Sequence, residues 1–392
     1  MDVLKEAKKV EEQIISWRRA LHSIPELELD LPKTSAYVKK ALDELGIHYK
    51  ELLGGNALVG LIRGREEGKT IALRADMDGL PIGEETGLEF ASKNGAMHAC
   101  GHDGHTAMLL GAAKILQENA HLLKGNVKLL FQPGEESPGG ALPMIEEGAL
   151  ENPHVDAVMG LHNGDLHPEI HSGKIGVRYG PMMAAADRVF IKIKGRGSHG
   201  AYPEQSVDPI TIAAELIMAL QTLVSRETAA VDPAVLSICK IKGGYNTNII
   251  PAEVELEGTV RTFNNETRIR LARRIEEMTK GITSAMRADC EVRYEFKYPA
   301  LINSDSFTDF FVESAKKILP QEDIIMLKEP VMGAEDMAYF LEKAPGTFFF
   351  LNNIRKIGGE SYPHHNSKFD LDESLFYKGT ALFVQTALDY LS

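Results

Sequence analysis

Short apolar runs alternate with helix-forming stretches early in the chain, and the same pattern returns near its end. The apolar runs occupy residues 70–73, 127–131, 155–161 and 347–351. Residues 14–21 and 34–45 carry apolar side chains at helical spacing, and Thr34 is expected to cap the second of these helices, with Pro32 just outside it. Strands that alternate with helices are typical of an α/β layered domain with a largely parallel sheet.

The pattern changes between residues 187 and 298. Its successive segments are an alternating strand at 188–194, a helix at 209–224, strands near 235–241 and 253–261, a helix at 266–286 and a strand at 290–296. This βαββαβ order is that of a ferredoxin-like α+β sandwich. Because the first pattern resumes after residue 300, the sequence predicts a discontinuous domain, 1–183 and 299–392, with a second domain inserted at 184–298.

Size and charge narrow the class of protein. A chain of 392 residues exceeds what one hydrophobic core usually serves, which agrees with two domains. The formal net charge of −13 disfavours nucleic acid or an anionic membrane surface as the main partner. The charged start differs from a signal peptide, and no apolar run approaches the roughly 20 residues that span a bilayer.

The three cysteines form no even disulfide framework, which suits a reducing compartment. A cytoplasmic protein is therefore expected. Cys239 and Cys290 are expected to be small buried residues. Cys100 differs from both because its neighbours are histidines and an aspartate.

Polar residues follow the apolar runs. Asp76 and Asp78 come after the first run, Glu135 and Glu136 after the second, and His162 after the third. The functional crevice of a parallel α/β sheet lies at the carboxyl ends of its strands, so these side chains are expected to share one region.

Cys100 and His102 flank a single glycine and add a thiolate and an imidazole to this set. A mixed sulfur, nitrogen and oxygen set suits zinc, manganese, cobalt or nickel better than calcium or magnesium. A redox cysteine is disfavoured because no second cysteine stands at disulfide-motif spacing. A nucleophilic Cys/His pair stays open, because spacing alone does not exclude it.

Adjacent side chains point in different directions, so one of Glu135 and Glu136 could bind a metal while the other handles protons. Metal-bound water has a depressed pKa, and a nearby carboxylate can take its proton during attack on a carbonyl. These residues indicate a metal-dependent hydrolase.

Several motifs, in order along the chain, resemble those of the aminoacylase/carboxypeptidase-type metallo-amidohydrolases. They lie at residues 73–81, 97–105, 132–136, 160–162 and 197–200. Within that superfamily the sequence is similar to the branch of hippurate hydrolases, N-acyl-amino-acid deacylases and auxin-conjugate hydrolases. The resemblance implies a metallo-exopeptidase-like α/β/α catalytic domain, with the inserted ferredoxin-like domain serving as lid and dimerisation domain.

The resemblance also implies two divalent metal ions, zinc, manganese, cobalt or nickel. The ligands carried over from the family are Cys100, His102, Glu136, His162 and His365, with Cys100 as the bridge. His365 is preferred to His364 because the family's histidine lies four residues before an aromatic. Glu135 would be the general acid/base, and Asp78 matches the family's catalytic-site aspartate. Asp76 stands where wider relatives carry a ligand histidine, and it could instead orient a histidine.

Three residues of the inserted domain gain a role only through the resemblance. His199 would stabilise the oxyanion, and in many relatives this histidine comes from the partner subunit, which predicts a homodimer or larger homo-oligomer. Asn248 and Arg261 would hold the substrate carboxylate, for which the planar fork of arginine is suited.

The other motif residues receive minor roles. His98, Asp103 and His105 are expected to support the metal ligands or to be structural, rather than to bind metal. Glu335 and Asp336 resemble a family motif near the site but receive no role. The remaining histidines expected at the surface or in loops are His22, His48, His121, His154, His167 and His171.

The sequence thus predicts a metal-dependent hydrolase of N-acyl amino acids, of the N-acetyl or N-benzoyl type. The alternatives are a metallocarboxypeptidase or dipeptidase, a catalytically silent metal-binding protein, and a cysteine hydrolase that would survive chelation and be lost to thiol alkylation.

Overall fold

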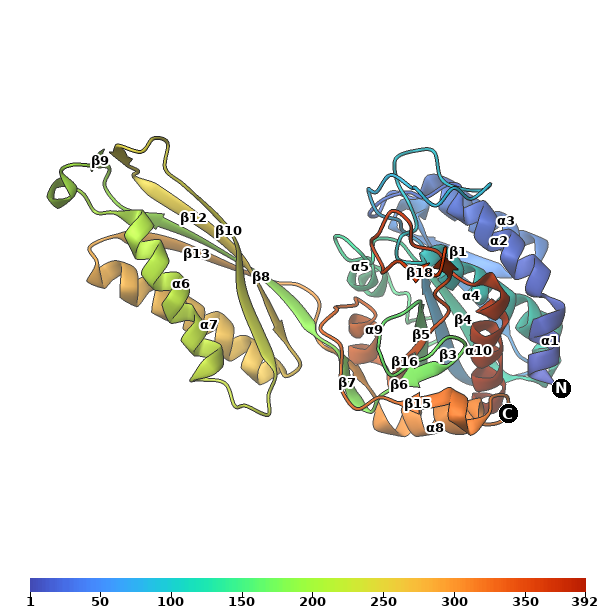
Figure 1. Ribbon diagram of the computed structural model, residues 1–392. Coiled ribbons are helices and arrows are strands. Elements are labelled where there is room, and N and C mark those ends of the chain that lie inside the picture. The colour runs from blue at the N-terminus through green and yellow to red at the C-terminus, as the bar shows by residue number, and fades with distance from the viewer. The chain divides into compact units, whose positions relative to one another are not determined.

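The computed structural model describes all 392 residues, which divide into two compact units (Figure 1). The first unit comprises Met1–Met182, Ile302–Val331 and Asp336–Ser392, and the second comprises Met183–Leu301 and Met332–Glu335. Compared with the predicted insertion at 184–298, the second unit also takes in Met183, residues 299–301 and residues 332–335. None of the helices combines the length and hydrophobicity that a bilayer crossing needs.

The first unit is built on an eight-stranded sheet with the order β1-β2-β4-β3-β5-β16-β6-β15. Its strands are β1 (His48–Leu52), β2 (Ala57–Arg63), β3 (Glu66–Asp76), β4 (Lys124–Gln132), β5 (Ala157–Asn163), β6 (Ile175–Val177), β15 (Ile324–Met326) and β16 (Gly346–Leu351). The central strands β4, β3, β5 and β16 run parallel, and antiparallel pairs flank them. The sheet is therefore mixed rather than largely parallel.

Helices cover both faces of this sheet. They are α1 (Val3–Lys9), α2 (Glu11–His22), α3 (Pro32–Glu44), α4 (His102–Glu118), α5 (Ala141–Glu146), α8 (Asp305–Ala315), α9 (Ala338–Lys343) and α10 (Phe376–Tyr390). α1, α2, α4 and α10 pack on one another over one face, and Figure 1 shows α5 and α9 on the other side of the sheet. The unit is the expected α/β/α sandwich.

The second unit has one antiparallel sheet, with the order β10-β12-β8-β13, and two helices packed together against it. Its main elements are β8 (Ala185–Lys194), α6 (Pro209–Ser225), β10 (Ala234–Gly243), β12 (Glu253–Thr262), α7 (Asn265–Ala285) and β13 (Asp289–Phe296). This sequence and strand order are those of the expected ferredoxin-like sandwich.

Short elements complete the structure. In the second unit β9 (Ser198–His199) pairs with β11 (Ile249–Ile250). The other short pairs are β7 (Gly180–Met183) with β14 (Leu301–Asn303), and the hairpin of β17 (Lys356–Ile357) and β18 (Glu360–Ser361).

Two local expectations are wrong. The second predicted helix begins at Pro32 and not after Thr34, because proline tolerates the first helical position, where no N–H is needed. Cys239 is exposed and Cys290 half-buried, since both lie on strands of a sheet whose helices cover only one face.

Candidate metal centre

Three neighbouring parallel strands of the first unit end in polar residues at the same edge of the sheet. β3 ends at Asp76, with Asp78 two residues later, and Glu135 and Glu136 follow the end of β4. His162 is the penultimate residue of β5. Asp76 pairs with Gln132 at the end of β4, so the strand ends lie side by side as predicted.

The turn before α4 adds Cys100 and His102. Gly101, between them, has a left-handed φ of 84°. A Cβ atom at this position would lie 2.2 Å from Oδ1 of Asn163, so glycine is required both by the backbone angle and by space. Cys100 and His102 are therefore held on either side of a turn that the rest of the site constrains.

Two groups of potential ligands share Cys100. Its Sγ atom lies with a nitrogen each of His102 and His162 in a group whose atoms are all within 4.8 Å of one another. The same sulfur forms a second group, to the same limit, with Glu136 and His365. The distance from Sγ to His162 Nε2 is 3.4 Å, and from His365 Nε2 to Glu136 Oε1 it is 3.0 Å. The two groups together contain the five predicted ligands, with the sulfur in common.

The buried atoms of this centre fit a cation. Neither ring nitrogen of His102 makes a hydrogen bond, although the side chain is fully buried. Carboxylate oxygens of Asp78, at 3.4 Å, and Asp76, at 3.8 Å, face its Nδ1, and one of Glu135 lies 4.0 Å from its Nε2. Burial lowers the pKa of His102, but Asp76, Asp78 and Glu136 outweigh it and raise the pKa to about 10. Several carboxylates therefore surround imidazole nitrogens that make no hydrogen bond, a mixed nitrogen and oxygen set that suits transition metal ions.

The thiol of Cys100 fits a ligand better than a nucleophile. Burial, with Glu136 and Glu135, raises the pKa of Cys100 well above its usual range. A thiol with a raised pKa is a poor nucleophile at neutral pH, whereas a divalent cation deprotonates a coordinating thiol outright. Burial beside two carboxylates thus favours the ligand role of Cys100 over the nucleophile role.

Asp78 holds the two glutamates in place. Its Oδ1 accepts the backbone N–H of Glu135 and its Oδ2 that of Glu136, each at 3.0 Å. Oδ1 also lies 3.4 Å from His102 Nδ1. These contacts are those of a positioning residue, because the Asp78 carboxylate holds groups of Glu135, Glu136 and His102. Glu135 itself is buried, and its carboxylate lies within 4.8 Å of the potential ligand atoms of His102 and Glu136.

Asp76 orients histidine, as the sequence allowed. Its Oδ1 accepts a hydrogen bond from Nδ1 of His105 at 2.5 Å, and its Oδ2 accepts from Arg74 at 2.7 Å. The other ring nitrogen of His105 accepts a backbone N–H, so neither is available to a metal ion although the ring lies close to His102.

The two adjacent histidines near the C-terminus differ in their contacts. His365 belongs to the second ligand group with Cys100 and Glu136. His364 belongs to neither group, and its Nε2 lies 3.0 Å from the backbone oxygen of Asn163. The geometry therefore favours His365 as the ligand, the residue chosen from the sequence.

His199, Asn248 and Arg261 lie in the second unit. β9 and β11 bring the first two together, with His199 opposite Ile249 and Gly200 N–H donating to Asn248 O at 2.7 Å. Arg261 lies on β12, opposite Ala186. Its guanidinium is half-buried and forms no ion pair, and burial lowers its pKa. Such an arginine is suited to bind an anion.

Sequence reasoning missed a buried ionic cluster on α2. His22, expected at the surface, is fully buried and bonds through Nδ1 to Asp103, at 2.7 Å, and through Nε2 to Glu84, at 3.0 Å. His167 is buried as well. Arg18 bonds to Asp103, Asp370 and Glu373. The sequence did indicate that Arg18 is buried, because it occupies a position on the apolar face of the helix that Ile14 and Leu21 define.

Asp336 was left without a role. Its carboxylate accepts hydrogen bonds from Arg74, at 2.9 Å, and from Gln132, at 2.7 Å, and also from the backbone N–H groups of Gly140 and Ala141 at the start of α5. Nothing in the hydrophobic pattern relates residue 336 to strands β3 and β4, so its contacts with Arg74 and Gln132 could not be predicted.

Comparison with known proteins places these features in a family. The profile of "Peptidase family M20/M25/M40" matches residues 72–389. The N-acetyl-L-cysteine deacetylase of Bacillus subtilis is 42% identical over 379 residues, 96% of this chain and 88% of that protein. Thermostable carboxypeptidase 1 of Saccharolobus solfataricus is 40% identical, and the match covers 100% of this chain and 99% of the carboxypeptidase. An N-acyl-L-amino acid amidohydrolase of Geobacillus stearothermophilus is 44% identical over 76% of this chain and 80% of its own length.

A solved structure supports the same family assignment. A dinuclear metal-binding peptidase of the M20 family from Bacillus subtilis superposes with a TM-score of 0.84 at 35% identity. The match covers 98% of this chain and 99% of that chain. The likeness therefore extends over both units.

Proposed function

This chain belongs to the peptidase family M20/M25/M40, and we propose that it hydrolyses the amide bond of N-acyl amino acids. The observation that carries this function is the pair of ligand groups that share Cys100 Sγ, with the carboxylate of Glu135 beside them. We propose that the site holds two divalent metal ions. Their ligands would be Cys100, His102, Glu136, His162 and His365.

The chemistry divides between the ions and the protein. When bound, the ions would polarise the substrate carbonyl and acidify the attacking water. Glu135 accepts a proton from that water as its oxygen bonds to the carbonyl carbon, and then gives the proton to the leaving nitrogen as the C–N bond breaks. Asp78 keeps Glu135 in reach through the backbone hydrogen bond.

The substrate class follows from the second unit and from the relatives. A half-buried guanidinium without an ion pair supports Arg261 as the group that binds the α-carboxylate, with two parallel hydrogen bonds. Asn248 would add an amide donor. Names such as N-acetyl-L-cysteine deacetylase and N-acyl-L-amino acid amidohydrolase among the relatives support an acylated, uncharged nitrogen on the substrate.

The geometry of the second unit supports a catalytic dimer. β12 runs from Glu253, beside the end of β8 that precedes His199, to Arg261. At about 3.4 Å per residue, those eight steps separate Glu253 from Arg261 by about 27 Å, and His199 lies at the Glu253 end, where β9 pairs with β11. That distance is far longer than an N-acyl amino acid, so both cannot contact one substrate within one copy. We propose that His199 and Asn248 serve the site of a partner copy, because Arg261 lies beside Ala186, where the chain enters the unit.

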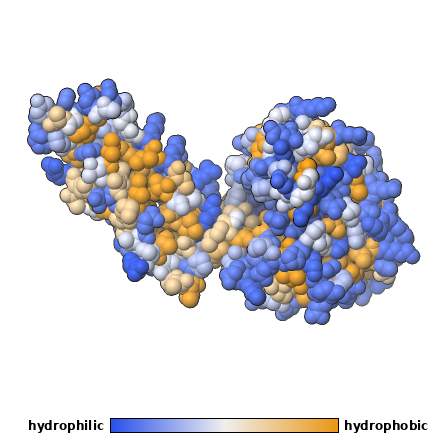
Figure 2. Space-filling view, viewed as in Figure 1, coloured by the Kyte–Doolittle hydropathy of each residue, from blue (hydrophilic) through white to orange (hydrophobic).

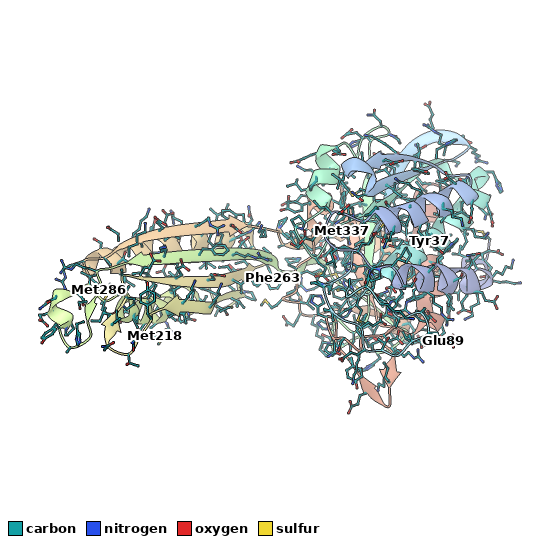
Figure 3. All side chains as sticks on the ribbon, turned by 90° about the horizontal axis from the view of Figure 1, so that it is seen from above. Tyr37, Glu89, Met218, Phe263, Met286 and Met337 are labelled. Atoms are coloured by element: carbon teal, nitrogen blue, oxygen red, sulfur yellow. The ribbon has the colours of Figure 1, made fainter.

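An apolar surface on the second unit would form the contact between copies. The outward face of α6 carries Ile210, Ala214 and Met218, of which Met218 is 70% exposed. β10 is an edge strand, paired on one side only, and carries exposed Ile241. Figure 2 shows hydrophobic surface gathered on this unit. Figure 3 labels Met218, which lies at the margin of the unit. An exposed sheet edge is a template for pairing with another chain, and an exposed apolar patch marks an interaction site.

The free cysteines bear on the cellular compartment in which the protein works. All three cysteines are unpaired, which supports a reducing compartment, and we propose the cytoplasm.

The experiment that tests the function is amine release from a panel of substrates. N-acetyl, N-benzoyl and N-indoleacetyl amino acids, with free dipeptides as a comparison set, would be offered to the chain before and after metal removal. We expect release from the acylated substrates that stops on chelation and returns with zinc, manganese, cobalt or nickel. No metal-dependent release from any member of the panel would overturn the proposal.

A carboxypeptidase or dipeptidase is the second candidate, favoured by the 40% identical carboxypeptidase. It would cleave the free dipeptides at least as fast as the acylated substrates. Activity that survives chelation but is lost on thiol alkylation would indicate a cysteine hydrolase, and metal binding without any turnover would indicate a silent binding protein.

A further inference from the structure

The peptide groups of Asn163, the last residue of β5, form hydrogen bonds with three histidines. Its N–H donates to Nε2 of His105 at 2.9 Å. Its backbone oxygen lies 2.9 Å from Nδ1 of His162 and 3.0 Å from Nε2 of His364. The strand ends here, and the N–H of the next residue, Gly164, turns to Leu351 and to the side chain of Asn353. The backbone of Asn163 is thus tied to side chains at the point where the sheet stops.

These contacts assign the protons of all three rings. A backbone N–H can only donate, so His105 accepts at Nε2 and carries its proton on Nδ1, which donates to Asp76. A backbone oxygen can only accept, so His162 carries its proton on Nδ1 and His364 carries one on Nε2. His162 is left with a lone pair at Nε2, the atom that lies 3.4 Å from Cys100 Sγ.

We propose that His105 and His364 are positioning residues of the metal centre, which act through the backbone of Asn163 to present Nε2 of His162 to the metal. His105 holds the N–H side of the residue and His364 the carbonyl side. The carbonyl so fixed holds His162 in one tautomer and one ring orientation. The inference rests on the proposed function, because it assumes that the centre binds metal.

The far end of this arrangement is anchored in the core. Asp76, which accepts from His105, is bonded to Arg74 at 2.7 Å, and Arg74 is bonded to Asp336 at 2.9 Å. Asp336 is fixed in turn by the backbone of Gly140, and these charged side chains are all almost fully buried. This chain of contacts gives Asp336 a role and supplies His105 with an acceptor that stays ionised beside a guanidinium.

The alternative is that these histidines only stabilise the fold, as satisfied buried polar groups do. The two roles differ in what each substitution preserves. A glutamine amide in place of His105 would reach the position of Nε2 and could accept the N–H of Asn163. The shorter amide of asparagine would reach only the position of Nδ1 and Asp76. We therefore compare His105→Gln with His105→Asn, which are equal in polarity.

The measurement is metal affinity of the purified chain by competition with a chromophoric chelator, together with the absorption spectrum of the cobalt-loaded protein. Loss of an outer hydrogen bond to a ligand typically weakens metal binding about 10- to 100-fold. We expect that loss, with an altered cobalt spectrum, in His105→Asn, His105→Leu and His364→Leu. His105→Gln and His364→Gln should stay near the wild-type affinity.

The matched control is His167→Leu. His167 is also a buried histidine of the first unit, and its Nδ1 also accepts a backbone N–H, that of Glu169 at 3.2 Å. We expect this variant to lose thermal stability and to keep its metal affinity. Equal affinities in His105→Gln and His105→Asn, or a fall in melting temperature without a change in affinity, would overturn the inference. Absence of metal binding by the unaltered chain would instead overturn the proposed function.

Discussion

Cys100 shows how far single residues of the site could be predicted. The thiol, His102 and Glu136 stand in compact local motifs, so their chemistry is visible in the sequence. The contacts of His22 and Asp336 are not, because their partners are 81 and 262 positions away along the chain. A buried charge on a helix face gives only a hint that a partner exists. Which partner it has depends on the packing of the whole unit.

The adjacent glutamates give a prediction at the scale of one residue each. Glu135→Gln removes the proton acceptor but no ligand, so turnover should fall about 10²- to 10⁴-fold while metal content stays near that of the unaltered chain. Glu136→Gln should lose metal and activity together. The checks are amine release and metal analysis of both variants. Loss of metal in Glu135→Gln alone would mean that the two roles are exchanged.

His22 gives a prediction about pH. Burial and Arg18 oppose its charge, but Asp103 and Glu84 outweigh them and raise the pKa of His22 above its usual value. A raised histidine pKa means that the folded state holds the proton more tightly than the unfolded state. The stabilisation is therefore complete below about pH 6.5, the unfolded pKa, and is lost as pH rises through the folded pKa.

The measurement is urea unfolding of the metal-free chain and of His22→Gln between about pH 5.5 and about pH 9, a range that brackets the ordinary histidine pKa. We expect the stability difference between the two to shrink as pH rises. A difference that is constant across this range, or that grows, would contradict the assignment of a charged His22.

At the scale of elements, the apolar runs identified the four central strands and missed the flanking ones. β3, β4, β5 and β16 correspond to the four predicted runs, because strands buried on both faces are continuously apolar. β1 is mostly exposed at the edge of the sheet, and β6 and β15 have three residues each. These three strands leave no clear pattern, whereas β2 is a buried apolar run that the sequence interpretation missed. The antiparallel flanks of the sheet were therefore not foreseen.

The start of α4 gives a prediction about an element. Gly101→Ala would place a Cβ 2.2 Å from Asn163 and hold alanine in the left-handed region, which alone costs about 1–2 kcal/mol. Because Cys100 and His102 flank this turn, we expect metal affinity to fall together with the free energy of unfolding.

The control is Gly281→Ala, in the interior of α7, where an added Cβ would meet nothing within 4 Å. That variant should gain about 0.5–1 kcal/mol in unfolding free energy and bind metal normally. Normal metal affinity in Gly101→Ala, measured by chelator competition, would show that the turn does not set the ligand positions.

At the scale of the whole molecule, the family, the fold and an enzyme that hydrolyses amide bonds were predicted from the sequence and are confirmed by the relatives. The change from α/β to βαββαβ patterning made the inserted second unit visible, because the two periodicities differ along the chain. The second passage of the chain through that unit, at residues 332–335, was not visible. A segment of four residues carries no period of its own.

The proposed dimer makes the last prediction, which concerns two copies of the chain. Glu135→Gln keeps His199 but loses the proton acceptor beside its own metal centre. His199→Ala keeps that proton acceptor but cannot supply a histidine to the partner copy. If His199 acts in the partner copy, each variant alone is nearly inactive. Random exchange of subunits would then restore about a quarter of the wild-type activity, because half of the dimers are mixed and each mixed dimer has one complete site. Met218→Asp, on the apolar face of α6, should abolish the recovery and shift the mass in solution to that of a monomer. A mixture that stays inactive although its subunits exchange would show that His199 serves its own copy, and Arg261 would then have to act across the dimer or not at all.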